Sequence, residues 1–228
     1  FSHGEPDEHA RTIRAVREAA DRLGRPVAIL QDLAGPKARI GEIAGGTVEL
    51  TPGARFALTT RAVPGGAREV SLGYRGLPGD VEPGDRLLLS DGAIELEVES
   101  TTDTDVVCRV AVGGPLSSRK GINAPSRSLR VGFPTDKDRD DLRFGLEQGV
   151  DLVALSFVRG AGDVRAVREL AAALTDDPPP LIAKIAKHEA LERIAEILDE
   201  ADGLMVARGA LGVEIPVGTD GGGNVVDL

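Results

Sequence analysis

The feature that most constrains the fold of this chain is a recurring pair of elements, an amphipathic helix followed by a short, continuous apolar run. Residues 6–23 have apolar side chains at helical spacings of three and four, and the run Val27, Ala28, Ile29 and Leu30 follows them. Such a run is typical of a strand that is buried on both faces of a parallel sheet. The pattern therefore predicts an α/β fold with a parallel sheet.

The second half of the chain carries further pairs of this kind, spaced about 25 to 30 residues apart. Thr135 and Asp138 resemble a capping box, which begins a helix that ends at Gly149. A proline-rich break at 178–180 separates the next helix from its strand. The helices expected in this half are 135–149, 164–174 and 191–198, and the expected strands are 152–158, 181–185 and 204–207.

Between these helical regions the hydrophobic period changes from helical to strand-like. Alternation is clear over 94–98 and 106–112, and proline-glycine and aspartate-glycine turns punctuate the segment. The sequence thus predicts a small all-β domain inserted into the α/β chain. The expected organisation is a first α/β part at 1–41, the inserted β domain at 42–130, a second α/β part at 131–216 and a glycine-rich flexible tail at 217–228.

Composition excludes several classes of function. The 228 residues carry 27 Lys+Arg against 37 Asp+Glu, a formal net charge of −10, which disfavours nonspecific binding to nucleic acid or to anionic lipid. The single cysteine cannot form an internal disulfide, and neither a signal peptide nor a long apolar run is evident. These observations lead us to expect a cytoplasmic protein that binds neither nucleic acid nor membranes.

In a parallel α/β fold, functional groups gather at the carboxyl ends of the strands. Each predicted strand here ends in a polar, cationic or glycine-rich stretch. These stretches, together with Phe1–Gly4 and a basic segment in the β insertion, resemble the motifs of pyruvate kinase, in the order in which that family carries them. The stretches are Gln31–Lys37, Ser118–Asn123, Ser156–Arg159, Ala183–Lys187 and Val206–Gly212.

The resemblance implies a TIM-type (β/α) barrel of which this chain holds the third to the sixth strands, with the β insertion as the family's lid domain. It also implies the glycolytic transfer of a phosphoryl group between phosphoenolpyruvate and ADP, giving pyruvate and ATP, with Mg²⁺ and K⁺ as cofactors. Such a transfer depends on fixed cations that position and neutralise phosphate. The resemblance further implies homo-oligomers, as the family forms, and we expect the family's C-terminal domain to be missing from this chain.

The resemblance carries catalytic and nucleotide-binding roles over to four charged residues. Lys184 matches the lysine that stabilises charge on the transferring phosphoryl group and on the enolate, and Arg39 matches an arginine that contacts phosphate. Lys120 matches a lid lysine that reaches the nucleotide phosphates, and Asp91 lies in the lid turn associated with closure. Lys120 and Asp91 fit equally well as ordinary hairpin charges.

Other matches concern the monovalent cation and the substrate carboxylate. Ser2, Asp32 and the backbone carbonyl of Leu33 match ligands of the K⁺ site, although a serine before a helix is also a common cap. Gly209 and Ala210 match a glycine-rich turn whose backbone N–H groups bind the substrate carboxylate.

The sequence departs from the family pattern at the two Mg²⁺ ligands. Where the family carries a glutamate and an aspartate, this chain has Ala186 and Ala210. A hard divalent cation requires oxygen ligands, so both ligand positions are lost. Two interpretations therefore stay open: a pyruvate kinase-like phosphotransferase, or a catalytically inactive relative or fragment that keeps phosphate or carboxylate binding.

Overall fold

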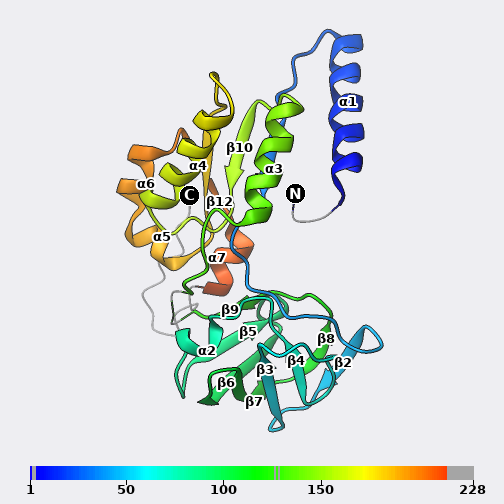
Figure 1. Cartoon of the computed structure of the whole chain (residues 1–228), viewed down its shortest axis with the longest axis vertical. Helices are drawn as coiled ribbons and strands as arrows, with labels where there is room; N and C mark the ends of the chain where they lie inside the picture. The colour runs from blue at the N-terminus through cyan, green and yellow to red at the C-terminus, as the bar shows by residue number, and fades with distance from the viewer. Residues whose placement is uncertain (2–3, 126, 128, 215–228) are drawn as a thin grey trace, which may run out of the picture. The chain divides into compact units, whose positions relative to one another are not determined.

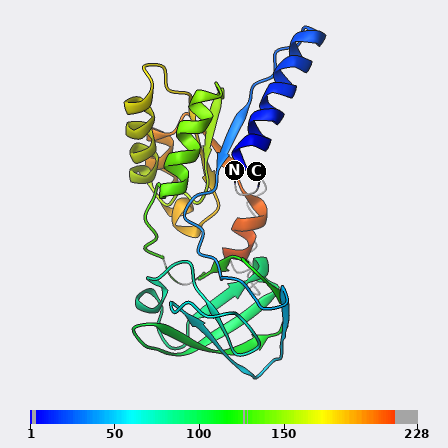
Figure 2. The ribbon, with the colours of Figure 1, turned by 45° about the vertical axis from the view of Figure 1, so that its right-hand side comes forward.

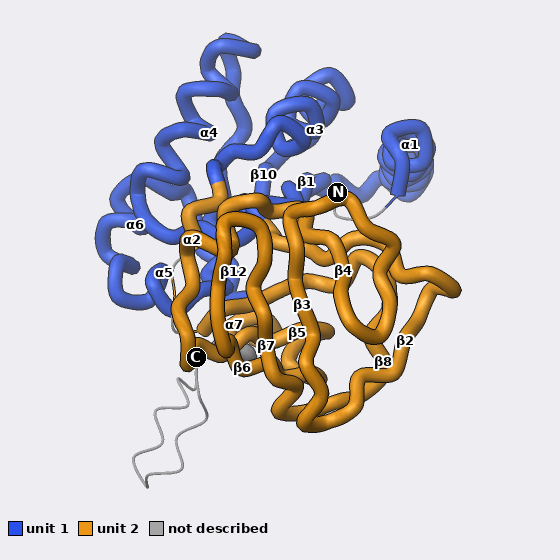
Figure 3. Tube along the Cα trace, turned by 60° about the horizontal axis from the view of Figure 1, so that its bottom comes forward, with its two compact units in different colours: residues 1–36, 132–207 blue, residues 37–131, 208–228 orange. Residues whose placement is uncertain are grey.

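The computed structural model describes residues 1, 4–125, 127 and 129–214. The chain forms two compact units, the first made of residues 1–36 and 132–207 and the second of 37–131 together with residues from 208 onward (Figure 3). The sequence placed the corresponding boundaries near 41 and 130. The expected tail at 217–228 lies outside the described residues, as does Ser2.

The first unit is built on a four-stranded parallel sheet in the order β1-β10-β11-β12 (Figure 1). Its strands are β1 (Leu30–Leu33), β10 (Leu152–Leu155), β11 (Leu181–Ile185) and β12 (Gly203–Val206). Its helices are α1 (Pro6–Leu23), α3 (Asp136–Glu147), α4 (Ala161–Leu174), α5 (His188–Glu192) and α6 (Ile194–Glu200). A parallel sheet joined by helices confirms the predicted α/β class and the partial TIM-type barrel.

Local sequence signals explain where the long helices begin and end. The side chain of Thr135 accepts a hydrogen bond from the backbone N–H of Asp138, and the carboxylate of Asp138 accepts one from the N–H of Thr135, so the predicted capping box is confirmed. Helix α1 begins at Pro6 with an acidic first turn and ends at Gly24, which adopts the left-handed conformation.

Side chains alternate between the two faces of the sheet, so apolar core residues and polar residues lie on opposite faces. Leu33, Leu155 and Ala183 point into the apolar cluster formed with helices α3, α4 and α6. The residues between them in the strands therefore point to the opposite face. This second face carries the polar side chains described below.

Three expectations about these elements were wrong. Strand β1 begins only at Leu30, and Val27 and Leu30 are exposed rather than buried, because no described strand pairs with the outer edge of β1. Strand β10 ends at Leu155 rather than at residue 158, since Phe157 adopts a positive φ that a strand cannot continue. The helix expected at 191–198 is interrupted at Arg193, which leaves helical geometry between α5 and α6.

The second unit is rich in β-structure. A six-stranded sheet has the order β4-β3-β7-β6-β5-β9, and β2 pairs with β8 in a separate two-stranded sheet. The strands are β2 (Thr47–Leu50), β3 (Arg55–Thr59), β4 (Glu69–Ser71), β5 (Arg86–Leu89), β6 (Ile94–Thr101), β7 (Asp105–Val112), β8 (Gly114–Ser117) and β9 (Ile122–Asn123), and the short helical segments are α2 (Leu77–Asp80), η1 (Ser90–Gly92) and α7 (Arg208–Glu214).

The strand patterning of this unit was predicted from the alternation in the sequence. Ile94, Leu96 and Val98 on β6 are buried, as are Val106 and Val110 on β7. Glu95 and Glu97, between the buried positions of β6, lie on the other face and pair with Arg86 of β5 and Arg109 of β7. Within the described residues of both units, no helix is long and apolar enough to span a membrane.

A polar cluster around the buried carboxylate of Asp80 ties α2 of the second unit to the segment near residue 130. The hydroxyl of Tyr74 donates to Asp80 Oδ2 over 2.5 Å, and Arg130 Nε donates to Asp80 Oδ1 over 2.6 Å. Burial, together with the hydrogen bond to the Asp80 carboxylate and its charge, raises the pKa of Tyr74 from its ordinary value of 10 to about 12. The protonated phenol therefore stabilises the fold below pH 10, and this contribution is lost as the pH rises through about 12.

The titration of Tyr74 can be measured by absorbance without interference, because it is the only tyrosine and the chain has no tryptophan. We expect the near-ultraviolet absorbance of tyrosinate to appear with a midpoint near pH 12 in the folded protein. In Asp80→Asn the midpoint should fall part of the way toward 10, because the negative charge is lost while the burial remains. The control Asp103→Asn, on an exposed turn, should titrate like the unaltered chain. Equal midpoints in all three proteins would contradict the assigned role of Asp80.

Candidate active site

Three polar side chains meet at the carboxyl ends of adjacent strands in the first unit. The strand register pairs Asp32 with Ala154, and Leu155 with both Leu33 and Ala183. Ser156, directly after β10, and Lys184, on β11, therefore come to the same level of the sheet as Asp32. All three lie on the face opposite the apolar core.

These three side chains form a closed network of hydrogen bonds. The ammonium of Lys184 donates to Asp32 Oδ1 and Oδ2 over 2.9 and 2.7 Å, and to Ser156 Oγ over 2.9 Å. The hydroxyl of Ser156 donates in turn to Asp32 Oδ1 over 3.1 Å. An ammonium has three N–H donors, so this arrangement fixes the position of the lysine nitrogen.

Burial of the Lys184 ammonium strengthens its attraction for an anion that binds beside it. The side chain of Lys184 is only 17% exposed, whereas that of Asp32 is 45% exposed. A fixed, largely desolvated ammonium interacts with an incoming phosphate or carboxylate more strongly than a free surface lysine does. Asp32 neutralises the lysine when no other anion is present.

Sequence reasoning assigned no role to Ser156. Its hydroxyl is nonetheless an acceptor for Lys184, and the residue is only 6% exposed. The available signal was a polar residue at the end of the apolar run 152–155, the same signal that singled out Asp32. The sequence placed Asp32 in the stretch that follows the apolar run 27–30, whereas in the structure Asp32 lies within β1.

The loop after β1 is held in place by close backbone packing. Gly35 has φ +70°, and a Cβ atom added there would lie 2.3 Å from the carbonyl oxygen of Ser156. Its N–H donates to Asp138 Oδ1 over 2.9 Å, so the buried carboxylate that caps α3 also holds this loop. Glycine at position 35 is therefore what allows β1 and the end of β10 to approach each other.

A second group of predicted residues gathers in the second unit. Arg39 pairs with Gly121 in an isolated antiparallel bridge, and its Nη1 donates to the carbonyl of Arg119 over 3.2 Å. The carbonyl of Lys120 accepts from the N–H of Ile40 over 2.9 Å. This pairing of the segments near 39 and 120 brings Arg39 and Lys120 together, although they are distant in the sequence.

Asp91 lies on a turn close to the same segments. Its backbone has φ 55°, and its side chain is 79% exposed, with Oδ1 lying 3.6 Å from Lys37 Nζ. The Lys37 side chain passes directly over Gly121, where an added Cβ would lie 2.2 Å from Lys37 Cε. The second unit thus collects Lys37, Arg39, Lys120 and Asp91 in one region, while their roles stay predictions.

The remaining predicted ligands have simpler surroundings. Gly209 and Ala210 lie in the first turn of α7, with Gly209 exposed and Ala210 half-buried. Leu33 is fully buried, so its backbone carbonyl is the only group it could offer to a cation. Ser2 lies outside the described residues.

The residues present do not fit a divalent metal. Among the described residues, no group of three or more His, Cys, Asp or Glu side chains is arranged to hold a metal ion. Ala186, two residues beyond Lys184, is buried and offers only a methyl group. The carboxylate of Asp32 has both oxygens engaged by Lys184. Asp32 and the Leu33 carbonyl are oxygen donors of the kind that K⁺ accepts.

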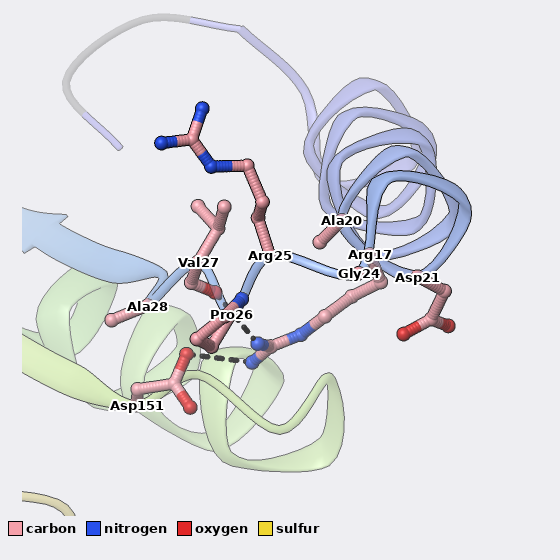
Figure 4. Close-up of a pocket in the computed structure, with 9 residues that line it drawn as sticks. All are labelled: Arg17, Ala20, Asp21, Gly24, Arg25, Pro26, Val27, Ala28 and Asp151. Carbon is pink, nitrogen blue, oxygen red and sulfur yellow. Dashed lines mark hydrogen bonds and ion pairs between the residues drawn. The ribbon is translucent and has the colours of Figure 1, made fainter.

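A separate hollow of about 670 Å³ lies at the amino ends of the strands, opposite the carboxyl ends that carry Lys184 (Figure 4). Arg17 reaches across it from α1 and donates to Asp151 Oδ2 over 2.7 Å, to the carbonyl of Val27 over 3.0 Å and to that of Gly149 over 2.9 Å. These contacts hold α1 beside β1. Because the hollow precedes β1 and β10, it is not part of the cluster around Lys184.

Comparison with known proteins gives consistent matches along almost the whole chain. The family model of the pyruvate kinase barrel domain matches residues 1–219. Pyruvate kinase 2 of Synechocystis sp. is 48% identical over 220 residues, and the pyruvate kinases of Geobacillus stearothermophilus and Thermotoga maritima are each 45% identical over 218 and 216 residues. The alignments cover 95% of this chain but only 37%, 37% and 46% of those relatives, so the chain spans less than half of their length.

The network around Lys184 should contribute measurably to stability. In Asp32→Asn the ammonium loses its counter-charge, and we expect the free energy of unfolding to fall by about 1 kcal/mol, a value that allows for the partial exposure of Asp32. Urea unfolding followed by far-ultraviolet circular dichroism measures this, since most of the helices belong to the first unit.

The matched control is Asp140→Asn on α3. Asp140 forms a solvent-exposed ion pair with Arg143 at 3.3 Å, and its loss should change the unfolding free energy by less than about 0.5 kcal/mol. If the two variants are equally stable, the Lys184 network is no more than another surface ion pair.

Proposed function

Because the chain belongs to the pyruvate kinase family, we propose that it supplies the central part of a phosphotransferase site that acts on phosphoenolpyruvate and ADP. The observation that supports this most directly is the fixed ammonium of Lys184 at the carboxyl ends of three parallel strands. In barrel enzymes this edge of the sheet carries the catalytic groups.

The proposed reaction balances without any redox step. A terminal phosphate oxygen of ADP forms a bond to the phosphorus of phosphoenolpyruvate, and the bond from that phosphorus to the enol oxygen breaks. The resulting enolate takes up a proton at its terminal carbon and becomes pyruvate. Lys184 meets the negative charge on the phosphoryl oxygens and on the developing enolate oxygen, where a preorganised cation is most effective.

The other predicted residues receive roles in the same proposal. Arg39 and Lys120 contact phosphate oxygens, and Asp91 takes part in closure of the lid turn. The backbone N–H groups of Gly209 and Ala210 contact the substrate carboxylate. Asp32 and the carbonyl of Leu33 hold K⁺ together with Ser2. Support for these roles comes from the family match and, for Arg39 and Lys120, from their proximity within the second unit.

Binding of phosphoenolpyruvate tests the role of Lys184 without requiring turnover. In Lys184→Met we expect the dissociation constant, measured by isothermal titration calorimetry, to rise at least about tenfold, since a charge-assisted contact worth roughly 1.4 kcal/mol or more is lost. Lys187→Met, three residues further along, is the matched control and should bind nearly as the unaltered chain does. Equal loss in both variants would show that Lys184 has no special role.

One specific observation favours a second function, namely binding of phosphate or carboxylate without turnover. Ala186 and Ala210 stand where the family's metal-ligating carboxylates are expected, and the described residues contain no alternative metal cluster. Without the charge of a metal ion, phosphoryl transfer loses a large part of its electrostatic stabilisation. Under this second proposal the chain is an inactive relative that keeps the anion-binding lysine.

Metal binding and ATP formation separate the two functions. The unaltered chain should bind Mn²⁺ weakly in the absence of substrate, as followed by electron paramagnetic resonance, and the double variant Ala186→Glu with Ala210→Asp should bind it at least about tenfold more tightly. ATP formation from phosphoenolpyruvate and ADP is then measured in both proteins. Tight Mn²⁺ binding or sustained ATP formation by the unaltered chain would exclude the inactive relative.

A further inference from the structure

Helix α3 packs against β1 along the segment that carries part of the candidate site (Figures 1 and 2). Two buried hydrogen bonds join the helix to this segment. The amide Nε2 of Gln31 donates to the backbone carbonyl of Asp141 over 2.6 Å. The backbone N–H of Gly35 donates to Asp138 Oδ1 over 2.9 Å. Residues 31–35 are therefore held by α3 at both ends.

The two site residues of β1 lie between these contacts. Asp32 directly follows Gln31, and a single residue separates Leu33 from Gly35. The proposed function uses the carboxylate of Asp32 and the backbone carbonyl of Leu33, and the same carboxylate accepts two hydrogen bonds from Lys184. A shift of this segment against α3 would thus move the groups that hold the Lys184 ammonium.

Both contacts lie in buried surroundings. Gln31 is 1% exposed and Asp138 is fully buried. Asp138 Oδ2 accepts from the backbone N–H and the hydroxyl of Thr135 over 3.0 and 2.7 Å, which leaves Oδ1 for Gly35. A Cβ atom added at Gly145 of α3 would overlap the Gln31 amide, so glycine lets this side chain lie against the helix. Buried polar groups with fixed partners specify one arrangement of the segment.

The contact at Gly35 also reaches the third member of the network. Gly35 has a positive φ and lies so close to the carbonyl of Ser156 that an added Cβ atom would overlap it. The Ser156 hydroxyl accepts from Lys184 and donates to Asp32. Asp138 therefore acts on Lys184 by two routes, one through Ser156 and one through the β1 segment itself.

We propose that Asp138 and Gln31 are positioning residues of the candidate active site. Each acts through other residues: it holds the β1 segment against α3, so that Asp32 and Ser156 keep the Lys184 ammonium in one place. A cation whose position is fixed before an anion arrives loses less freedom when the anion binds. This inference rests on the proposed function for the identity of the anion, but its central test requires no ligand.

The central test measures how fast the Lys184 nitrogen reacts with acetic anhydride, with Lys187 of the same molecule as the reference and mass spectrometry as the readout. The Lys184 side chain is 17% exposed and its ammonium is hydrogen-bonded, so it should react slowly in the unaltered chain. In Asp138→Ala and in Gln31→Met we expect its rate relative to Lys187 to rise at least about threefold, because the network opens more often.

Gln31→Met separates positioning from stability. Gln31 Oε1 is buried and has no hydrogen-bond partner among the described residues, so a thioether of similar size removes an unsatisfied polar atom together with the bond to α3. We therefore expect the urea midpoint of unfolding to change little while Lys184 reacts faster. The same variant decides the question if Asp138→Ala does not fold.

The matched control is Thr135→Val. This change removes the hydroxyl that caps α3 and so lowers stability, but the N–H of Gly35 keeps its bond to Asp138. The acetylation rate of Lys184 should therefore stay as in the unaltered chain. Amide hydrogen exchange followed by NMR checks this difference, since the Gly35 N–H should exchange at least about tenfold faster in Asp138→Ala than in Thr135→Val.

Binding of phosphoenolpyruvate, measured by calorimetry, then connects the position of Lys184 with the proposed function. The dissociation constant should rise at least about threefold in Asp138→Ala and Gln31→Met, and it should stay unchanged in Thr135→Val. If the unaltered chain binds no phosphoenolpyruvate, the proposed function fails, while the acetylation rates still decide whether α3 positions Lys184.

Two results would overturn the inference. An unchanged acetylation rate of Lys184 in either folded variant, Asp138→Ala or Gln31→Met, would exclude the role assigned to that residue. A rise of the same size in Thr135→Val would show that the rate follows the stability of α3 and not the two contacts with β1.

Discussion

The parallel register of β1, β10 and β11 is the constraint on which the rest of the first unit depends. It brings the carboxyl ends of three strands to one level, and the alternation of side chains then sends Leu33, Leu155 and Ala183 into the apolar core and Asp32, Ser156 and Lys184 to the opposite face. A shift of one residue in any one strand would exchange the core-facing and site-facing residues of that strand. The same register therefore specifies both the core and the candidate site.

Support for this register comes from buried polar contacts as well as from apolar packing. The Asp138 carboxylate caps α3 and also accepts the N–H of Gly35, so a single buried side chain links the start of a helix to the loop after β1. Gln31 Nε2 donates to the carbonyl of Asp141 on the same helix over 2.6 Å. Buried polar groups of this kind specify one arrangement because any other would leave them without partners.

The charged groups of the two units, each taken by itself, differ from those of a metal-dependent phosphotransferase. The described residues offer cations, namely Lys184 in one unit and Lys37, Arg39 and Lys120 in the other, but no cluster of carboxylates for a divalent ion. Cations alone can bind a phosphate or a carboxylate. Phosphoryl transfer requires more than binding, because the negative charge that develops between the two reacting oxygens must also be neutralised.

The sequence by itself determined the elements whose causes are local. The helix periods, the Thr135–Asp138 capping box, the strand 181–185 and the alternation of β6 all follow from short-range patterns, and the motifs at the strand ends were enough to indicate the family. Only the tertiary structure decided that Ser156 completes the Lys184 network, that Val27 and Leu30 are exposed, and that Arg193 interrupts a helix. Lys184 and Asp32 are 152 residues apart, and their contact depends on strand order and register, which no local pattern contains.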